Sequence, residues 1–160
     1  NPSLVGSEMC IRDRSQAVAN VFKQELLKGN HDFDGGATYK ISLYTSSATL
    51  GATTANYAAT ASDNQVANGN GYATAGNALQ NPAVTGGSSS STAFADFDNI
   101  SWPNASFSAA GGLMYRSDGS APTNDAVAVL SFGGTFTATN GTFTIQFPTA
   151  GGGSEILRLS

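Results

Sequence analysis

Much of this chain alternates apolar and polar residues one by one, and this pattern suits an extended strand with one buried face. The ranges 39–44 and 142–147 alternate in this way, so we expect a half-buried strand in each. The range 126–132 is apolar on both sides, with Val127 and Val129 on one and Leu130 and Phe132 on the other, and it predicts a strand at the centre of its sheet. The same pattern predicts further strands at 72–78, 93–97, 107–115, 136–139 and 156–159.

Pairs of residues that favour tight turns separate these expected strands. Glycine, and to a lesser degree asparagine, adopts the positive φ angles that two-residue hairpin turns require. Many short strands joined by such turns are typical of an antiparallel β-sandwich or a jelly-roll-like barrel, so we expect a mainly all-β fold of this kind. The turn pairs are Asn68-Gly69, Asn70-Gly71, Gly86-Gly87, Asp118-Gly119, Gly133-Gly134 and Asn140-Gly141.

One segment near the N-terminus has helical spacing instead. Val18, Val21, Phe22 and Leu26 recur at helical intervals, and Gly29 stands where a helix would end, so the sequence predicts a short amphipathic helix over 17–28. These four apolar side chains are candidates for an interface with a neighbouring subunit. The alternative is that the helix packs on its own sheet.

Two stretches show neither the alternation of a strand nor the spacing of a helix. The range 46–70 is rich in Ala, Thr and Asn, and the range 85–92 is mostly Gly and Ser, so both predict surface loops. A loop as long as the first is unusual in a compact domain. We therefore expect it to pack against a neighbouring molecule or to contain an edge strand.

The first residues have a different origin. The run LVGSEMCIRD at 4–13 resembles the translation of a transposase adapter used in sequencing-library preparation, and the match extends over 3–14. We therefore expect residues 1–14 to be non-native and the natural chain to begin near Ser15, and the source to be an assembly of environmental DNA or RNA sequences. Residues 15–160 are expected to form one β-sandwich domain. The one cysteine, Cys10, lies in this run, so the natural part offers no disulfide or thiol chemistry.

Charge is scarce throughout the chain. Charged residues make up 11% of the sequence and the formal net charge is −4. A nucleic-acid partner would need basic side chains for phosphate contacts, so we expect none. No apolar run approaches the roughly 20 residues that span a bilayer, so no membrane partner is expected either. A neutral polar surface suits copies packed side by side.

The densest group of possible ligands lies at 31–36. Asp32 and Asp34 stand beside a glycine turn and are weak candidates for a calcium site, but the other ligands of a complete calcium loop are absent. An Asx turn is the simpler interpretation. His31 could act as a base, although no nucleophile stands at a recognisable spacing. We therefore expect no metal and no cofactor.

Other candidate residues point to carbohydrate chemistry. Asp96, Asp98 and Asp118 could supply the two carboxyl groups of a glycosidase, but solvent-facing strand and turn positions explain them more simply, so we do not expect an enzyme. Trp102 and Tyr57 could stack on sugar rings. The alternative for Trp102 is a buried core position at the end of a strand.

Several longer runs share their sequence with a known group of proteins. They are FKQELLKGNHDF at 22–33, YKISLYTS at 39–46, Gly71-Tyr72 with Ala75-Gly76, the region of Trp102, GLMY at 112–115, AVAVLSFGG at 126–134 and GTFTIQFP at 141–148. In these runs the chain resembles a group of small virion-associated structural proteins of tailed bacteriophages. The resemblance implies a structural part of the virion, with copies of itself and other capsid or tail proteins as partners and no active-site signature. Capsid decoration is the first expectation, a tail or neck accessory is the alternative, and a carbohydrate- or receptor-binding module is a second class.

Overall fold

A computed structural model describes residues 17–86, 91–118, 124–148 and 156–159. The fold is mainly β, with 46% strand and 9% helix in antiparallel sheets, and this confirms the expected fold class. The described residues form two stacked layers of strands and no closed barrel. The expected non-native residues 1–14 lie outside the described ranges.

The larger layer is a five-stranded sheet with the order β1-β8-β7-β2-β3. The expectation of a central strand at 126–132 is confirmed, since that strand pairs with β1 on one side and β7 on the other. The strands are β1 (Ala17–Val18), β8 (Ala126–Thr137), β7 (Ser108–Arg116), β2 (Tyr39–Tyr44) and β3 (Asn77–Ala78).

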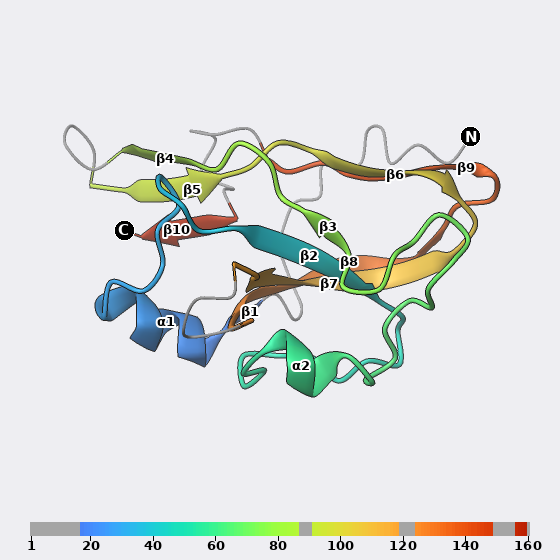
Figure 1. The fold of residues 1–160 in the computed structure, drawn as a ribbon, viewed down its shortest axis with the longest axis horizontal. Helices are drawn as coiled ribbons and strands as arrows, with labels where there is room; N and C mark the ends of the chain where they lie inside the picture. Colours follow the sequence, from blue (N-terminus) through green and yellow to red (C-terminus); the bar gives the residue numbers. More distant parts are fainter. Residues whose placement is uncertain (1–16, 87–90, 119–123, 149–155, 160) are drawn as a thin grey trace.

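The second layer contains two smaller sheets. One has the order β10-β5-β4, with β10 (Leu157–Leu159), β5 (Ala93–Asp96) and β4 (Ala83–Gly86), and the other pairs β6 (Ile100–Ala105) with β9 (Gly141–Ile145). Figure 1 shows β4, β5, β6 and β9 above the five-stranded sheet. The core lies between the layers, where the ring of Tyr39 on β2 is 6.0 Å from that of Phe97.

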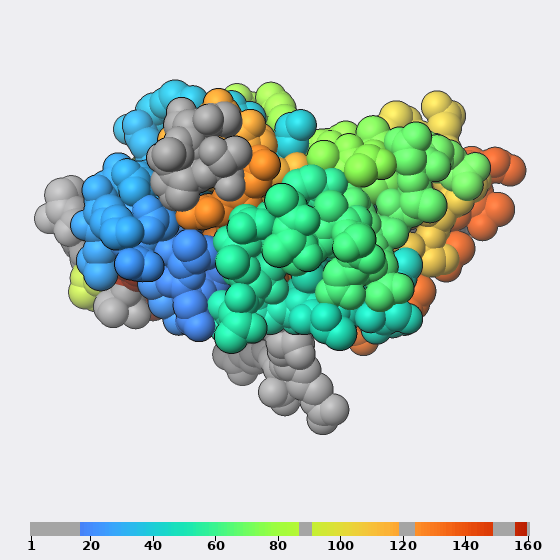
Figure 2. Space-filling view, turned by 60° about the horizontal axis from the view of Figure 1, so that its bottom comes forward, coloured from blue at the N-terminus to red at the C-terminus, as the bar shows by residue number. Residues whose placement is uncertain are grey.

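The outer face of the five-stranded sheet is covered by the segment 45–76, which includes the short helix α2 (Tyr57–Thr60). Figure 2 shows this segment, teal to green, spread over the face that comes forward. Ser42 and Tyr44 lie beneath it and are 0% and 1% exposed. The prediction of a half-buried β2 was therefore wrong, because a folded loop shields the side that alternation assigns to water.

This covering segment contains no edge strand. Isolated bridges pair Tyr44 with Gln65 and Asn56 with Asp125, and Asn56 caps α2 by accepting a hydrogen bond from the Ala59 N–H at 2.8 Å. The inner side of the segment packs on its own sheet, and the expectation that the segment packs against a neighbouring molecule stays a prediction.

The N-terminal helix α1 spans Asn20–Leu27 and is shorter than the expected 17–28. Ala17 and Val18 form β1 and pair with Val129 and Ala128 of β8. The Ala19 N–H then donates to the Val127 carbonyl at 2.9 Å. Pairing along the flank of β8 thus replaces the first helical turn, since it supplies backbone partners to both strands.

Two glycines that were expected to form a turn lie inside a strand. Ala109 and Gly111 are two residues apart on β7, whereas their partners Phe136 and Ser131 are five apart on β8. The extra residues form a bulge around Gly133-Gly134, where Gly133 has φ +76°. Residues 136 and 137 of the expected strand 136–139 are therefore the end of β8, and this range is not a separate strand.

Other boundaries also differ from the sequence pattern. The expected strand 72–78 is reduced to β3, and the expected loop 85–92 begins within β4. β6 has no counterpart among the expected strands, because Pro103 and Asn104, whose φ is +54°, interrupt its alternation. The expected turn at Asn140-Gly141 is confirmed between β8 and β9, whereas Gly87 and Gly119 lie outside the described residues.

Candidate functional site

Asp32 and Asp34 lie in the loop before β2. The Asp34 N–H donates to Asp32 Oδ1 at 3.0 Å, which is the geometry of an Asx turn. A Cβ on Gly35 would stand 1.8 Å from Asp32 Oδ2, so the Asp32 carboxylate folds back over its own loop. No group of three acidic, histidine or cysteine side chains suitable for a metal occurs in the described ranges. The loop therefore favours a structural turn.

His31 is buried beside this turn and faces the core. Its ring lies 4.7 Å from that of Phe22 and 6.0 Å from that of Tyr39, and its Nδ1 is 3.3 Å from the Tyr39 hydroxyl. Its Nε2 has no hydrogen-bond partner in the part of the chain that the structure describes. Burial, with a smaller effect from Arg116, lowers the pKa of His31 to about 4. A base this weak and enclosed does not suit proton transfer near neutral pH.

Beside His31, several of the few charged side chains gather between α1 and the ends of β7 and β8. Glu25 accepts from Lys28 Nζ at 2.7 Å and from Asn30 Nδ2 at 2.6 Å. Arg116 donates to Asp118 Oδ2 at 2.9 Å and also to the Asn30 carbonyl. These contacts join α1, the loop after it and β7, so this cluster holds the helix on the sheet.

Two carboxyl groups near this cluster have pKa values that shift in opposite directions. Hydrogen bonds from Lys28 and Asn30 lower the pKa of Glu25. Burial raises the pKa of Asp125, which is 8% exposed. Such a pair could divide acid and base roles, but the partners of Glu25 already occupy both of its oxygens. The arrangement favours a structural role.

Phe22, one of the interface candidates, is only 4% exposed. Its ring packs against those of His31 and Phe33, with the centroids of Phe22 and Phe33 6.0 Å apart. Phe22 therefore anchors α1 to its own chain and cannot reach a second molecule.

The other three interface candidates are partly buried against the core. Val18 belongs to β1 and not to the helix, whereas Val21 and Leu26 lie on α1. An interface role for them stays a prediction. Leu27, which the helical pattern did not single out, is the outward apolar side chain of α1 and is 91% exposed.

Trp102 lies inside the molecule on β6 and is 1% exposed. Its ring is 6.0 Å from Phe143 on β9 and 6.4 Å from Tyr72 of the covering segment. The glycan-stacking interpretation of Trp102 is therefore wrong, because the ring has no free face, and the core alternative is confirmed.

Tyr57 is half-buried at the start of α2. It stacks on Tyr115 of β7, with 4.6 Å between ring centroids, and its hydroxyl donates to Gln65 Oε1 at 3.1 Å. One face of the ring is thus occupied, and Tyr57 and Trp102 lie on different layers. They do not form a common stacking platform.

The three aspartates considered for a glycosidase each bond locally. Asp96 Oδ1 accepts from the Phe97 N–H at 2.9 Å, Asp98 accepts from Asn81 Nδ2, and Asp118 pairs with Arg116. The geometry favours structural contacts for all three.

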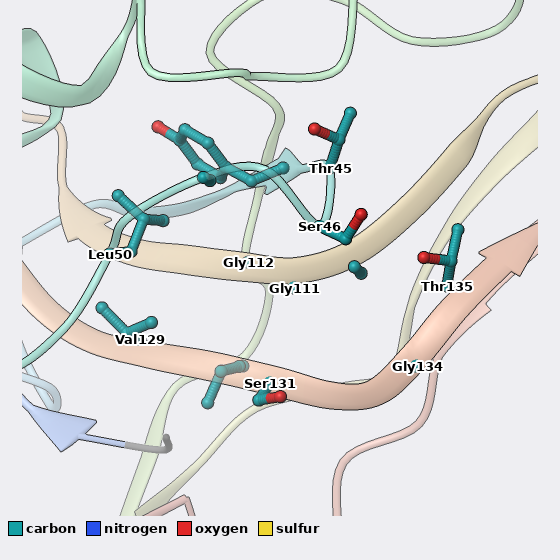
Figure 3. A pocket seen from close by; sticks show the side chains of 13 residues that line it. Thr45, Ser46, Leu50, Gly111, Gly112, Val129, Ser131, Gly134 and Thr135 are labelled. Atoms are coloured by element: carbon teal, nitrogen blue, oxygen red, sulfur yellow. The ribbon is translucent and has the colours of Figure 1, made fainter. Parts of the chain in front are cut away.

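A hollow of about 330 Å³ lies on the outer face of the five-stranded sheet. Figure 3 shows Thr45, Ser46 and Leu50 on one side, with β7 and the bulged part of β8 on the other. Gly111 and Gly112 of β7 form its floor. The signal for this site in the sequence was the glycine pair inside a strand, which often marks close approach of another backbone or ligand.

The lining of this hollow is uncharged. It combines hydroxyl groups of Thr45, Ser46, Ser131 and Thr135 with aliphatic carbon. Among the lining residues that the structure describes, the one titratable group is that of Tyr44, and burial raises the pKa of its hydroxyl, which is hydrogen-bonded to Thr60 at 2.9 Å. Such a lining can hydrogen-bond neutral groups but holds no acid or base poised near neutral pH.

Comparison of the chain with protein-family models, curated proteins and solved structures finds no match. No helix among the described residues is long and apolar enough to cross a membrane.

Proposed function

We propose that this protein is a non-enzymatic structural subunit of a tailed-bacteriophage particle and that it decorates the capsid. The proposal combines the resemblance of its longer sequence runs to small virion-associated proteins with the character of its surface. Copies of this chain and other virion proteins would be its partners.

The observation that carries the proposal is the nearly uncharged covering of the five-stranded sheet. Between Lys40 and Asp96 the one charged residue is Asp63. The segment 45–76 lies within this range and covers much of the face shown in Figure 2. Asp63 itself accepts two hydrogen bonds from Thr49, at 2.9 and 2.8 Å.

A broad neutral face suits a protein that occurs in many neighbouring copies. Like charges on adjacent subunits would repel one another, whereas hydroxyl and amide groups can hydrogen-bond to a neutral shell. The hollow over Gly111 and Gly112 adds a concave feature with the same neutral chemistry. Together these features support a contact surface and not a reaction site.

The alternatives differ in what supports them. A carbohydrate-binding module would need exposed aromatic rings, but Trp102 is buried and Tyr57 is stacked on Tyr115. A tail or neck position would use the same neutral surface as capsid decoration. It is therefore an outcome of the experiment below.

The test is a cryo-EM reconstruction of tailed-phage particles purified from the source sample, combined with mass spectrometry of their proteins. We expect peptides of this chain in the particle fraction and density that fits its two-layer fold at repeated sites on the capsid lattice. Density confined to the tail or neck would replace capsid decoration by the alternative. Absence from particles, with peptides only in the unassembled fraction, would overturn the proposal.

A further inference from the structure

The two outer strands of the three-stranded sheet in the second layer differ in charge. β10 and β4 are the two outer strands of the sheet β10-β5-β4. β10 carries Arg158, and a charged residue hinders pairing of an edge with another copy. β4 contains Ala83, Val84, Thr85 and Gly86, all exposed and none charged. β4 therefore lacks the charged side chain that protects many natural edge strands.

An apolar row across this sheet stops at β4. Leu157, Ala95 and Val84 are register partners in turn, so their side chains lie on one face. Leu157 and Ala95 are each 6% exposed, whereas Val84 is 51% exposed. Among the described strands β4 has no partner on the side beyond Val84, where a fourth strand would lie.

The other edges of the described sheets are less suited to pairing. β1 and β3 each contain two residues, which is too short for a ladder. β6, one of the two strands of the sheet β6-β9, contains Pro103, which has no N–H to donate to a further strand. β9 is uncharged, but its large apolar residues Phe143 and Ile145 are buried, and Thr144 on its polar face bonds to Ser101 at 2.8 Å. Among these edges, β4 combines an open ladder with exposed apolar area.

We propose that β4 pairs in antiparallel fashion with β4 of a second copy of this chain, about a two-fold axis. Such pairing places a strand opposite itself, which would bring like charges together in a charged strand. The sequence Ala-Val-Thr-Gly has no charge to oppose it. The two three-stranded sheets would then join into one six-stranded sheet, and the two Val84 side chains would extend the apolar row.

The extent of the edge limits the strength of this contact. β4 has four residues, and Pro82 just before it has no N–H to extend the ladder. A stable dimer usually buries on the order of 1,200 Å² or more, which an edge of this length does not supply alone. We therefore expect weak, concentration-dependent pairing, suited to copies that are already held near one another.

Single-cysteine cross-linking tests the pairing. In a Cys10→Ser background, Val84→Cys and Thr85→Cys place a thiol on β4, whereas Thr142→Cys on β9 and Leu159→Cys on β10 are matched controls. Opposite residues of antiparallel strands lie about 4.5–5.5 Å apart at Cα, within disulfide range. Because pairing raises the effective thiol concentration, we expect at least one β4 variant to give roughly tenfold more disulfide dimer than either control.

Equal cross-linking in all four variants would indicate random collision and overturn the proposal, as would preferential cross-linking of a control. Circular dichroism would first establish that each variant is folded.

Sedimentation velocity of uncross-linked protein supplies a second measurement. Val84→Lys should abolish the rise in average sedimentation coefficient with concentration, whereas Thr142→Lys should retain it. A wild-type protein that stays monomeric up to its solubility limit would also overturn the proposal. Pairing is a property of the chain alone, so its failure would leave the proposed virion role standing.

Discussion

His31 shows how burial of one residue can couple stability to pH. The aromatic rings around it exclude water, and burial is the largest cause that lowers its pKa from the ordinary value of 6.5 to about 4. Arg116 contributes in the same direction, whereas Glu25 and Asp118 oppose it. The folded protein therefore keeps His31 neutral at pH values where the unfolded chain protonates it.

We expect this difference to make the protein less stable in mild acid. Between pH 6.5 and about 4 the unfolded chain binds more protons than the folded chain, so the free energy of unfolding falls as the pH falls. The contribution of His31 is up to ~3 kcal/mol over that interval. Urea denaturation at several pH values measures it.

His31→Phe is the matched variant, since it keeps a ring against Phe22 and removes the titrating group. We expect its stability to change less than that of the wild type between pH 6.5 and 5. Glu25 and Asp63, whose pKa values are lowered, should destabilise both proteins at lower pH. Identical pH profiles above pH 5 would show that His31 is not the titrating group.

Gly76 permits the close approach of the covering segment to β2. Its φ is +70°, and a Cβ there would stand 1.8 Å from the Ile41 carbonyl oxygen. We expect Gly76→Ala to destabilise the fold by more than ~2 kcal/mol, because both the backbone conformation and the contact oppose a side chain. Thermal denaturation measures the loss. Gly36→Ala is the control, since a Cβ at Gly36 meets nothing within 4 Å; an equal loss in both variants would contradict this explanation.

At the scale of elements, a tyrosine takes the place of a strand beside β2. β3 pairs only with Lys40 and Ile41, and beyond it the Leu43 N–H donates to the Tyr72 hydroxyl at 2.9 Å. The Leu43 carbonyl accepts from the Val66 N–H at 2.9 Å. The covering segment thus completes the hydrogen bonding of β2 where the sheet ends.

Tyr72→Phe should therefore destabilise the protein by about 1–3 kcal/mol, since it leaves the buried Leu43 N–H without its acceptor. Tyr57→Phe removes a hydroxyl that bonds only to the side chain of Gln65 in the described structure, and should cost about 0.5–1 kcal/mol. Chemical denaturation of the two variants gives the comparison. A larger loss for Tyr57→Phe would mean that Tyr72 does not complete the edge.

The sequence pattern located the elements with one buried face and missed those shaped by contacts with distant residues. β5, β7 and β9 lie close to their expected positions. β6 was missed because Pro103 interrupts its pattern, and β1 was taken for helix because Val18 also fits a helical period. The periodicity of a short segment carries no information on the backbone hydrogen-bond partners that β8 supplies to β1, which is far away in the sequence.

At the scale of the whole molecule, the single tryptophan reports on the core shared by both layers. Trp102 contacts Phe143 of β9 and Tyr72 of the covering segment, so loss of any of these elements would expose it. We expect tryptophan fluorescence and far-ultraviolet circular dichroism to give the same unfolding midpoint, as for a cooperative single domain. Separate midpoints would show that 15–160 does not unfold as one unit.

The candidate sites also fall into two groups: those that a local sequence motif indicates and those that depend on contacts between residues distant in sequence. The Asx turn at Asp32 is a local motif that the sequence could indicate. The cluster around Glu25 depends on Arg116, which donates to the carbonyl of Asn30 although the two residues are 86 positions apart in the sequence. The hollow requires the loop after β2 to meet the bulge in β8. No spacing in the sequence predicts either meeting.

Alternation, φ preference and composition are local or additive properties, so the sequence was enough to establish the class of the fold, the turn at Asn140-Gly141 and the scarcity of charge. The burial of both faces of β2, the enclosure of Trp102 and the place of β4 at the edge of the described sheet became known only from the packed structure. These outcomes depend on which distant segments cover a surface. Coverage is set by packing of the whole chain and not by the residues that are covered.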